Sequence, residues 1–437
     1  MTTLSPTSPF VPSVFLDAPQ LTHAGQPDWF IASQRKAWED FTNAPMPGRK
    51  DENWRFANLS LLQFDAFKRL PSAETPEFNG LEKTAARVVT VNDATAVRET
   101  TFRGVSVLSL NEALSAHAEI LKPLLVSPDT KLGGAKFAAL HHAQLNDATV
   151  IIVPANAEIA DPVEIVHWLS GEGASSFPRT IILAGDNARV TVVEHHLTAN
   201  GDAGFSCGAA QIVAQRGAGV KYIQVNRHNA ASKFVHLSTV RCERDAQVKH
   251  ATFNLGSGYV RGEALSLIAG EGSRSDMLSV SLASANQEID QRTLQDHLTP
   301  RGFSDLLYKN VLFDQSKTIF AGLIRVDEGA HYTDAYQKCR NLLLSDECEA
   351  NSMPGLEINA DEVKCSHGST SGRLSEEEVF YFRSRGIERE AAEHMISMGF
   401  TMEVIARLEC EVVESMVIRE VEKRFVELEG RESAARK

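Results

Sequence analysis

Short apolar runs rich in β-branched residues recur between about residue 86 and residue 365, separated by brief polar turns. Examples are ARVVTV, RTIILAG, ARVTVVEHH and VKYIQVN, with NDA, GDN, GAG and NLGSG between such runs. A long series of short strands suits a solenoid, in which each coil buries its face only by stacking on the next coil. The pattern therefore favours a mainly β protein with a parallel β-helix core. Because no exact repeat length is visible, an all-β sandwich or a pair of sandwiches stays open.

Helical periodicity is concentrated towards the two ends of the chain. Residues 28–44 predict an amphipathic helix that follows Pro27 and has Asp28 at its start. Two further helical segments, LNEALSAHAEILKPLL and GAKFAALHHAQ, occur early in the β-rich part. We interpret the chain as an N-terminal helical region (1–85), a β-helix core (86–370) and a C-terminal helical domain (371–437).

The C-terminal zone carries its own start and stop signals. Ser375 and Glu378 form an S-x-x-E capping box, and Gly386 stands where a glycine ends that helix. A second helix, EREAAEHMISM, is expected to end at Gly399. A third segment carries a broad apolar face over residues 402–428, which must pack on the core or on a partner.

Composition and charge narrow the class of protein. Hydrophobic residues make up 43% and charged residues 23%, as in ordinary soluble proteins. The net charge of -13 argues against a nucleic-acid or anionic-membrane surface. The N-terminus has no basic residue before Arg35, which argues against a secretory signal. No apolar run reaches about 18 residues, so no membrane span is predicted. We expect a cytoplasmic protein.

The common chemical motifs are missing or weak. The six cysteines form no C-x-x-C pair, which predicts free thiols in a reducing compartment. The sequence has neither a P-loop nor a G-x-S-x-G elbow. His195 and His196 are neighbours in a predicted strand and point to opposite faces, whereas His141 and His142 are neighbours in a predicted helix. We interpret all four as packing or surface histidines.

Cys365 and His367 are the best candidates for metal chemistry. They lie two residues apart in ADEVKCSHGSTSGRL, so an extended backbone places both side chains on one face. Sulfur and imidazole nitrogen both suit a soft metal ion. Two ligands do not complete a site, which needs four, or three with an open position. The spacing alone leaves a metal site and a packed thiol with a packed histidine as alternatives.

The stretch from TDAYQKCRNLLLS through PGLEINADEVKCSHGSTSGRLSEEEVFYFRSRGIEREAAEHMISMGF resembles the SufB/SufD family of iron–sulfur cluster assembly proteins. KCSHG with LSEEEVFYFRSRGI, and PMPGRKDENWRF near the N-terminus, are similar to its SufD branch. Arg340 and Asn341 are followed by leucines, where the paralogous subunit carries a functional cysteine. Ser369 departs from the alanine common at this place, a change between small residues. The resemblance covers essentially the whole chain.

The resemblance implies a right-handed parallel β-helix and a non-catalytic scaffold subunit. It implies two partners, a SufB-like subunit bound through the β-helix core and a SufC-like ABC ATPase bound through the C-terminal helices, which would supply the missing P-loop. It also implies a transient iron–sulfur cluster shared with the SufB-like subunit. His367 is then a ligand, Cys365 is a ligand or a packed residue, and thiolate and carboxylate groups of the partner complete the site.

Other functions remain open from the sequence. Flavin binding occurs in such complexes, but no flavin motif is present here. A purely structural scaffold that never touches iron is one alternative function. A polysaccharide-acting β-helix enzyme is another, although such an enzyme predicts a secretion signal.

Overall fold

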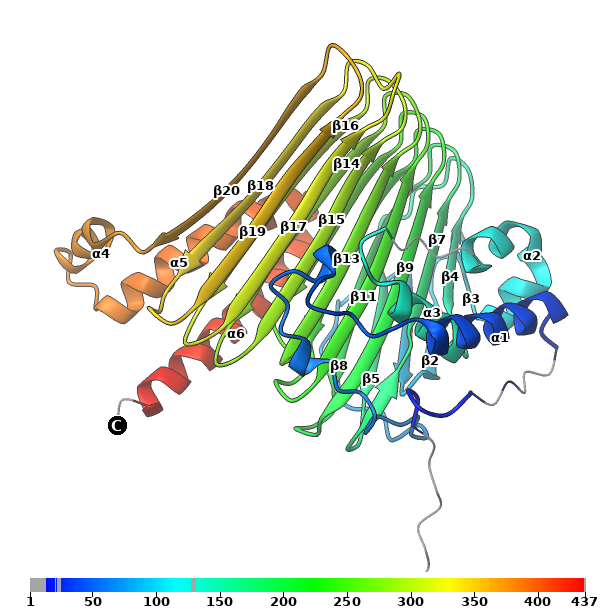
Figure 1. The fold of residues 1–437 in the computed structure, drawn as a ribbon, viewed down its shortest axis with the longest axis horizontal. Coiled ribbons are helices and arrows are strands. Elements are labelled where there is room, and N and C mark those ends of the chain that lie inside the picture. Colours follow the sequence, from blue (N-terminus) through cyan, green and yellow to red (C-terminus); the bar gives the residue numbers. More distant parts are fainter. Residues whose placement is uncertain (1–12, 20, 22–24, 127–130, 436–437) are drawn as a thin grey trace, which may run out of the picture.

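The computed structural model describes residues 13–19, 21, 25–126 and 131–435, and its centre is a parallel β-solenoid (Figure 1). The first twelve residues, part of the segment used to argue against a secretory signal, lie outside the described residues. Within the described part, the strands form two sheets, with strands that alternate between them along the chain. The predicted parallel β-helix core is confirmed, and the sandwich alternative is wrong.

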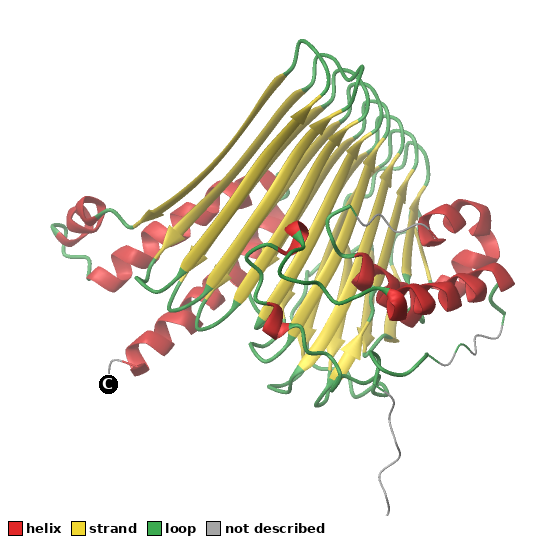
Figure 2. Cartoon of the chain, viewed as in Figure 1, coloured by secondary structure: helices red, strands yellow, loops and turns green. Residues whose placement is uncertain are grey.

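The first sheet runs, in spatial order, through β2 (Ala94–Thr100), β1 (Ala86–Val91), β5 (Val163–Leu169), β8 (Arg189–Thr198), β10 (Gly219–Arg227), β12 (Gln247–Asn254), β14 (Arg274–Ala283), β16 (Phe303–Leu312), β18 (Asp334–Leu343) and β20 (Lys364–Arg373). The second sheet runs through β19 (Glu349–Ile358), β17 (Lys317–Val326), β15 (Glu288–His297), β13 (Tyr259–Ile268), β11 (Lys233–Cys242), β9 (Gly204–Ala214), β7 (Arg179–Ala184), β4 (Thr149–Val153) and β3 (Ser106–Leu108), with β6 (Ala174–Ser176) beside β9. Figure 2 shows these strands stacked side by side, with the helices outside them.

The turns between coils are built alike at one corner of the solenoid. Asn187, Gly217 and Asp245 occupy successive coils with positive φ values of 56°, 66° and 56°. The N–H of each donates to a carbonyl of the following coil, at 2.8, 2.8 and 3.0 Å. Glycine, asparagine and aspartate adopt this left-handed conformation at the lowest cost. The polar turn residues of the sequence therefore give the coils a common register.

The N-terminal end of the solenoid is closed by antiparallel strands and helices. β2 pairs antiparallel with β1, and β3 pairs antiparallel with β4. Helices α1 (Asp28–Asn43), α2 (Leu110–Val126) and α3 (Ala135–Gln144) pack there (Figure 1). The helix expected at residues 28–44 is confirmed. Its N-cap is Pro27 without a side-chain cap, so Asp28 is the first helical residue and not the cap.

Three helices follow the last strand, namely α4 (Glu376–Arg383), α5 (Arg389–Ile405) and α6 (Glu411–Ala435). The side chain of Ser375 accepts the N–H of Glu378, which confirms Ser375 as the N-cap of α4. The expected helix end at Gly399 is wrong, because α5 continues to Ile405. The flanking Met398 and Phe400 pack against the apolar cluster of the first sheet, which keeps this glycine within the helix.

The broad apolar face predicted after residue 402 is covered by the protein itself. It packs on the outer face of the first sheet, against residues such as Val225, Phe253 and Val280. The buried helical residues are Val404, Ile405, Leu408, Val413, Met416, Val417, Val421, Phe425 and Leu428. The face is therefore part of the core and is not a free docking surface. Among the described residues, no helix combines the length and apolarity that crossing a bilayer requires.

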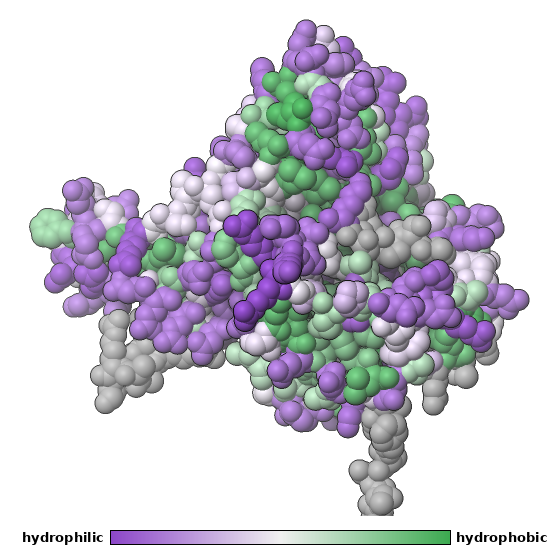
Figure 3. Space-filling view, in the orientation of Figure 1, coloured by the Kyte–Doolittle hydropathy of each residue, from purple (hydrophilic) through white to green (hydrophobic). Residues whose placement is uncertain are grey.

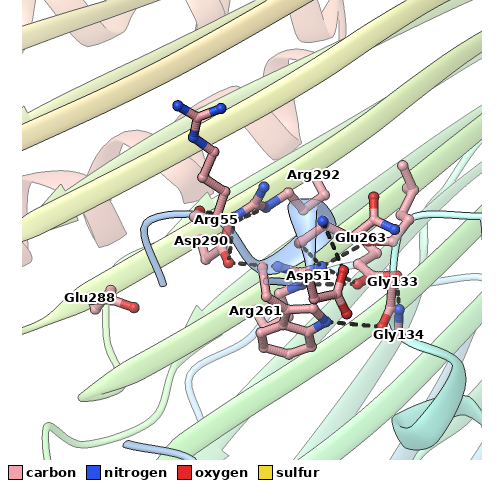
Figure 4. A network of polar contacts seen from close by, with 12 residues as sticks. Asp51, Arg55, Gly133, Gly134, Arg261, Glu263, Glu288, Asp290 and Arg292 are labelled. Carbon is pink, nitrogen blue, oxygen red and sulfur yellow. Dashed lines mark hydrogen bonds and ion pairs between the residues drawn. The ribbon is translucent and has the colours of Figure 1, made fainter. Parts of the chain in front are cut away.

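The segment PMPGRKDENWRF is fastened to the outer face of the second sheet by a buried charged network (Figure 4). The indole N–H of Trp54 donates to the carbonyl of Gly133 at 3.1 Å, and the guanidinium of Arg261 lies 4.0 Å from the indole centroid. Arg261 also donates to Asp290 and Glu263, at 2.6 Å each. Since Arg261 is fully buried, these two carboxylates compensate its charge.

Backbone groups of this segment and of the residues that follow it directly complete the attachment. Arg292 donates to the carbonyl of Arg55 at 2.8 Å, and the N–H of Asn58 donates to Glu288 at 2.8 Å. The side chains of Glu52 and Arg55 are exposed. The segment is thus held by one buried tryptophan and by its main chain.

Candidate functional site

Cys365 and His367 both lie in β20, the last strand of the first sheet. The register places Cys365 beside Ala335 and His367 beside Gln337 of β18. The extended backbone expected for this stretch is therefore present, and residues two apart in a strand share a face. β20 ends its sheet in the described structure, so this face lies at the C-terminal end of the solenoid.

The two side chains differ in their surroundings. Cys365 is half-buried and packs against a small apolar cluster that includes Ile324, Val326 and Ala330. Burial, with the nearby charge of Asp334, raises the pKa of its thiol above the ordinary value. His367 is exposed to solvent. In the isolated chain, His367 is thus open to an external group, whereas Cys365 is partly enclosed.

Cys339 is a thiol on the same face that the sequence interpretation did not single out. It lies in β18 beside Ser369 of β20, so it is two positions along the strand from the pair of Gln337 and His367. The Nδ2 atom of Asn310 lies 3.7 Å from its sulfur. Burial raises the pKa of the Cys339 thiol to about 12. Cys339 and Cys365 are 26 residues apart in the sequence. Their position on one face therefore becomes visible only when β18 is aligned with β20.

A polar ladder runs along the inner face of the first sheet, back from β20. In each strand of the first sheet from β1 to β20, the residue at one shared register position is polar. The members are Thr90, His167, His196, Asn226, Asn254, Ser281, Asn310, Asn341 and Ser371. All but Ser371 are buried. The interior of the solenoid is thus polar along one line.

The adjacent histidines of β8 point to opposite sides, as predicted. The ring of His195 lies 4.9 Å from that of Phe78, whereas the ring of His196 lies 5.2 Å from that of His167, a member of the interior ladder. Both rings are buried. The prediction that these two histidines do not share a ligand is consistent with this arrangement.

A comparison with known protein families shows which family the chain belongs to. The family model described as the SufBD core domain of SUF system FeS cluster assembly matches residues 167–400. This range covers most of the solenoid, the strand with Cys365 and His367, and most of α5. The chain belongs to the SufB/SufD family. The resemblance on which the sequence interpretation rested is thereby confirmed.

Individual relatives place the chain near the SufD branch of the SufB/SufD family. The iron–sulfur cluster assembly protein SufD of Bacillus subtilis is 26% identical over 91% of this chain and 94% of its own length. SufD of Escherichia coli is 29% identical over 87% of this chain and 89% of its own length. SufB of Bacillus subtilis is 25% identical over 86% of this chain and 85% of its own length. The chain is SufD-like within a family of related subunits.

Proposed function

We propose that this chain is a scaffold subunit that pairs with a SufB-like subunit through the last coil of its solenoid. The support is the change in exposure along the solenoid. β16 is almost fully buried, whereas β19 and β20 consist of exposed and half-buried residues. An unpaired strand edge carries free N–H and C=O groups that another chain can bind. A partner strand or face is the natural cover for this coil.

The pair of subunits holds a transient iron–sulfur cluster as its cargo. His367 provides an imidazole nitrogen and Cys365 a thiolate once its proton is displaced by iron. Thiolate and carboxylate groups of the partner complete the coordination. Because the ligands are divided between two chains, a change in subunit arrangement dismantles the site and releases the cluster. The exposed position of His367 is the single observation that carries this proposal.

The chain has no catalytic role of its own in this proposal, and an ABC-type ATPase supplies the energy of the cycle in the cytoplasm. The ATPase binds at α4 and the start of α5. Phe380 and Tyr381 of α4 are 71% and 55% exposed, and Met395 of α5 is 49% exposed. Figure 3 shows hydrophobic atoms at the outer tip of the region that α4 occupies. Exposed aromatic residues of this kind are enriched in protein interfaces.

The test of the shared cluster is His367→Ala, expressed together with the partner subunits. We expect the complex to assemble and its iron and sulfide content to fall. Ser366→Ala is the matched control, because Ser366 is an exposed residue of the opposite face of β20. Wild-type iron, sulfide and visible absorbance in the His367 variant would contradict the ligand role and leave a purely structural scaffold. The family assignment gives no support to a polysaccharide-acting enzyme.

The ATPase contact is tested separately by Phe380→Ser with Tyr381→Ser. Co-purification of the ATPase should fall while the pair of β-helix subunits persists. Val426→Ser on α6 is the control, since Val426 is equally exposed but lies on another helix. Undiminished ATPase binding to the α4 variant would show that the ATPase does not bind at Phe380 and Tyr381.

A further inference from the structure

Three potential metal ligands meet inside the solenoid, far from β20 in the sequence. A carboxylate oxygen of Glu194 and one imidazole nitrogen each of His196 and His236 lie within 4.8 Å of one another. Glu194 and His196 belong to β8 of the first sheet, and His236 belongs to β11 of the second sheet. We propose that Glu194, His196 and His236 form a buried site for a divalent first-row transition metal ion such as Fe²⁺ or Zn²⁺.

Three of the four imidazole nitrogens of His196 and His236 lack a hydrogen-bond partner within the described structure, although Nε2 of His196 lies 3.6 Å from Oε1 of Glu194. All three side chains are almost completely buried. Neither nitrogen of His196 and not the Nε2 atom of His236 has a hydrogen-bond partner among the described residues, whereas Nδ1 of His236 lies 3.1 Å from the hydroxyl of Ser238. A buried polar atom without a partner costs about 1–3 kcal/mol. A metal ion bound by one nitrogen of each imidazole would remove that cost for the nitrogen it binds.

Glu194 is held in place by a second layer of residues. Its Oε1 atom lies 2.9 Å from Nε2 of His167, and its Oε2 atom accepts the hydroxyl of Tyr222 at 2.7 Å. The hydroxyl of Thr90 lies 2.8 Å from the other nitrogen of His167. Metal-binding carboxylates and imidazoles are commonly oriented by such outer hydrogen bonds. Thr90, His167 and Glu194, which are linked by these hydrogen bonds, all belong to strands of the first sheet.

Burial and the contact with His167 determine the pKa shifts of the three side chains. Burial alone would raise the pKa of the Glu194 carboxyl, but the hydrogen bond and charge of His167 hold it below its ordinary value. Burial lowers the pKa of His236 to about 4 and also lowers the pKa of His196.

The donor set selects the class of metal. Two imidazoles with one carboxylate bind zinc in catalytic sites and ferrous iron in oxygenases, with open positions in both cases. Hard ions such as Mg²⁺ and Ca²⁺ prefer oxygen ligands, of which the triad offers few. The site lies within one chain and needs no partner subunit. It is therefore independent of the proposed cluster at Cys365 and His367.

The experiment uses the full chain without a histidine tag and with Cys365→Ser and His367→Ala, which removes the other candidate ligands. The protein is produced in medium supplemented with Fe²⁺ or Zn²⁺, because a buried ion exchanges slowly, and is dialysed before metal analysis. We expect about one ion per chain, as for a single mononuclear site. Glu194→Gln and His236→Asn in this background should lose it. His250→Asn is the matched control, since His250 is also a buried interior histidine but lies outside the triad.

Far-UV circular dichroism establishes that each variant is folded, and the thermal midpoint is measured after metal removal and after reloading. Metal should raise the midpoint of the parent and of the His250 variant, and not that of the Glu194 variant. Thr90→Val should keep the stoichiometry and weaken metal affinity about tenfold. Folded Glu194 and His236 variants with the metal content of the parent would overturn the proposal. So would a folded parent that carries no metal after reloading.

Discussion

The two ends of the solenoid are finished in different ways. At the N-terminal end, β2 and β3 reverse direction and pair antiparallel, and buried residues such as Leu110, Leu114 and Leu121 of α2 cover the first coils. At the C-terminal end, β19 and β20 end their sheets with exposed and half-buried residues. α5 and α6 pack on the outer face of the first sheet and do not extend the strand edge.

This difference shows which surfaces the chain closes by itself. A repeat protein needs a polar or capped terminal coil to stay soluble and monomeric. The N-terminal end meets this need with apolar helices, and the C-terminal end does so with small polar residues in KCSHGSTSGR. The first solution is permanent. The second leaves backbone groups available to another chain.

The largest expected effect comes from ending the chain at Gly372, which removes α4, α5 and α6. The truncation removes the nine buried apolar side chains that pack on the outer face of the first sheet, and that face becomes exposed. Each such burial contributes about 1.5–3 kcal/mol, so the sum is comparable to or larger than the roughly 5–15 kcal/mol stability of a typical protein. We expect no soluble folded protein, assessed by soluble yield and circular dichroism.

A chain that ends at residue 430 is the control for this truncation, because it keeps Leu428, the last residue of the buried helical set. It should fold normally. A soluble, cooperatively unfolding product from the Gly372 truncation would contradict the packing role of the helices and restore them as a separate docking domain.

Arg261→Ala tests the attachment of the N-terminal segment to the second sheet. The change removes the cation paired with the buried Glu263, leaves Asp290 paired with Arg292 alone, and removes the contact with Trp54. Breaking a buried ion pair in this way costs about 3–5 kcal/mol. Arg216→Ala is the control, because its ion pair with Asp186 is exposed and should be worth about 1 kcal/mol or less. Equal thermal midpoints for the two variants would show that the network is not needed.

The same attachment should respond to pH through Glu288. Burial, together with the charge of Asp290, raises the pKa of this carboxyl from 4.5 to about 7, although the N–H of Asn58 lowers it. The folded state therefore holds a proton that the unfolded state releases, so this group's contribution to stability falls as pH rises from 4.5 to about 7. Glu288→Gln keeps the acceptor oxygen and removes the titration. Above pH 7 it should be more stable than the wild type by roughly 3 kcal/mol.

The measurement for Glu288→Gln is the unfolding free energy of both proteins across pH 5 to 8. At the low end of this range the two should approach one another, because Glu288 is then protonated in the folded state. Glu52→Gln serves as the exposed control. Parallel pH profiles of the wild type and the Glu288 variant would be the contrary result.

The smallest effect on the isolated chain is expected at the open end. Leu356 of β19 is partly exposed, so Leu356→Ala should change stability by about 0.5 kcal/mol or less. Leu121→Ala at the closed end removes a fully buried side chain and should cost about 2–5 kcal/mol. The order reverses for association, where only Leu356→Ala should weaken binding of a SufB-like subunit in a pull-down. Equal losses of stability at both positions would mean that the two ends are alike.

Much of the fold follows from local patterns in the sequence. The run TVIIV in β4 is buried or half-buried at every position, which is why it reads as a continuous apolar segment and not as an alternating one. The N-cap at Ser375 and the helix after Pro27 depend on neighbours in the chain. The prediction that a helix ends at Gly399 was wrong because packing of the adjacent residues outweighs the low helix propensity of glycine.

The candidate sites needed information that the sequence pattern does not hold. The spacing of Cys365 and His367 predicted a shared face, and the strand supplies it. By contrast, Glu194 and His236 are 42 residues apart and belong to different sheets, so no spacing rule connects them. His196 was interpreted as a packing or surface residue because only its neighbour His195 was considered. The amphipathic pattern of α6 likewise showed an apolar face without showing what covers it.

Because the coils share one register, the number of coils determines the distance between the two ends of the solenoid. Among the described strands, eight steps separate β1 from β20 in the first sheet. At about 4.8 Å a step, they set the capped end and the open end roughly 40 Å apart. The separation depends on how many coils there are and hardly at all on which residues fill them. Deleting one whole coil between equivalent corner turns would shorten the span by a fixed increment, and insertion would lengthen it by the same amount. The length of the solenoid can therefore change only in steps of one whole coil.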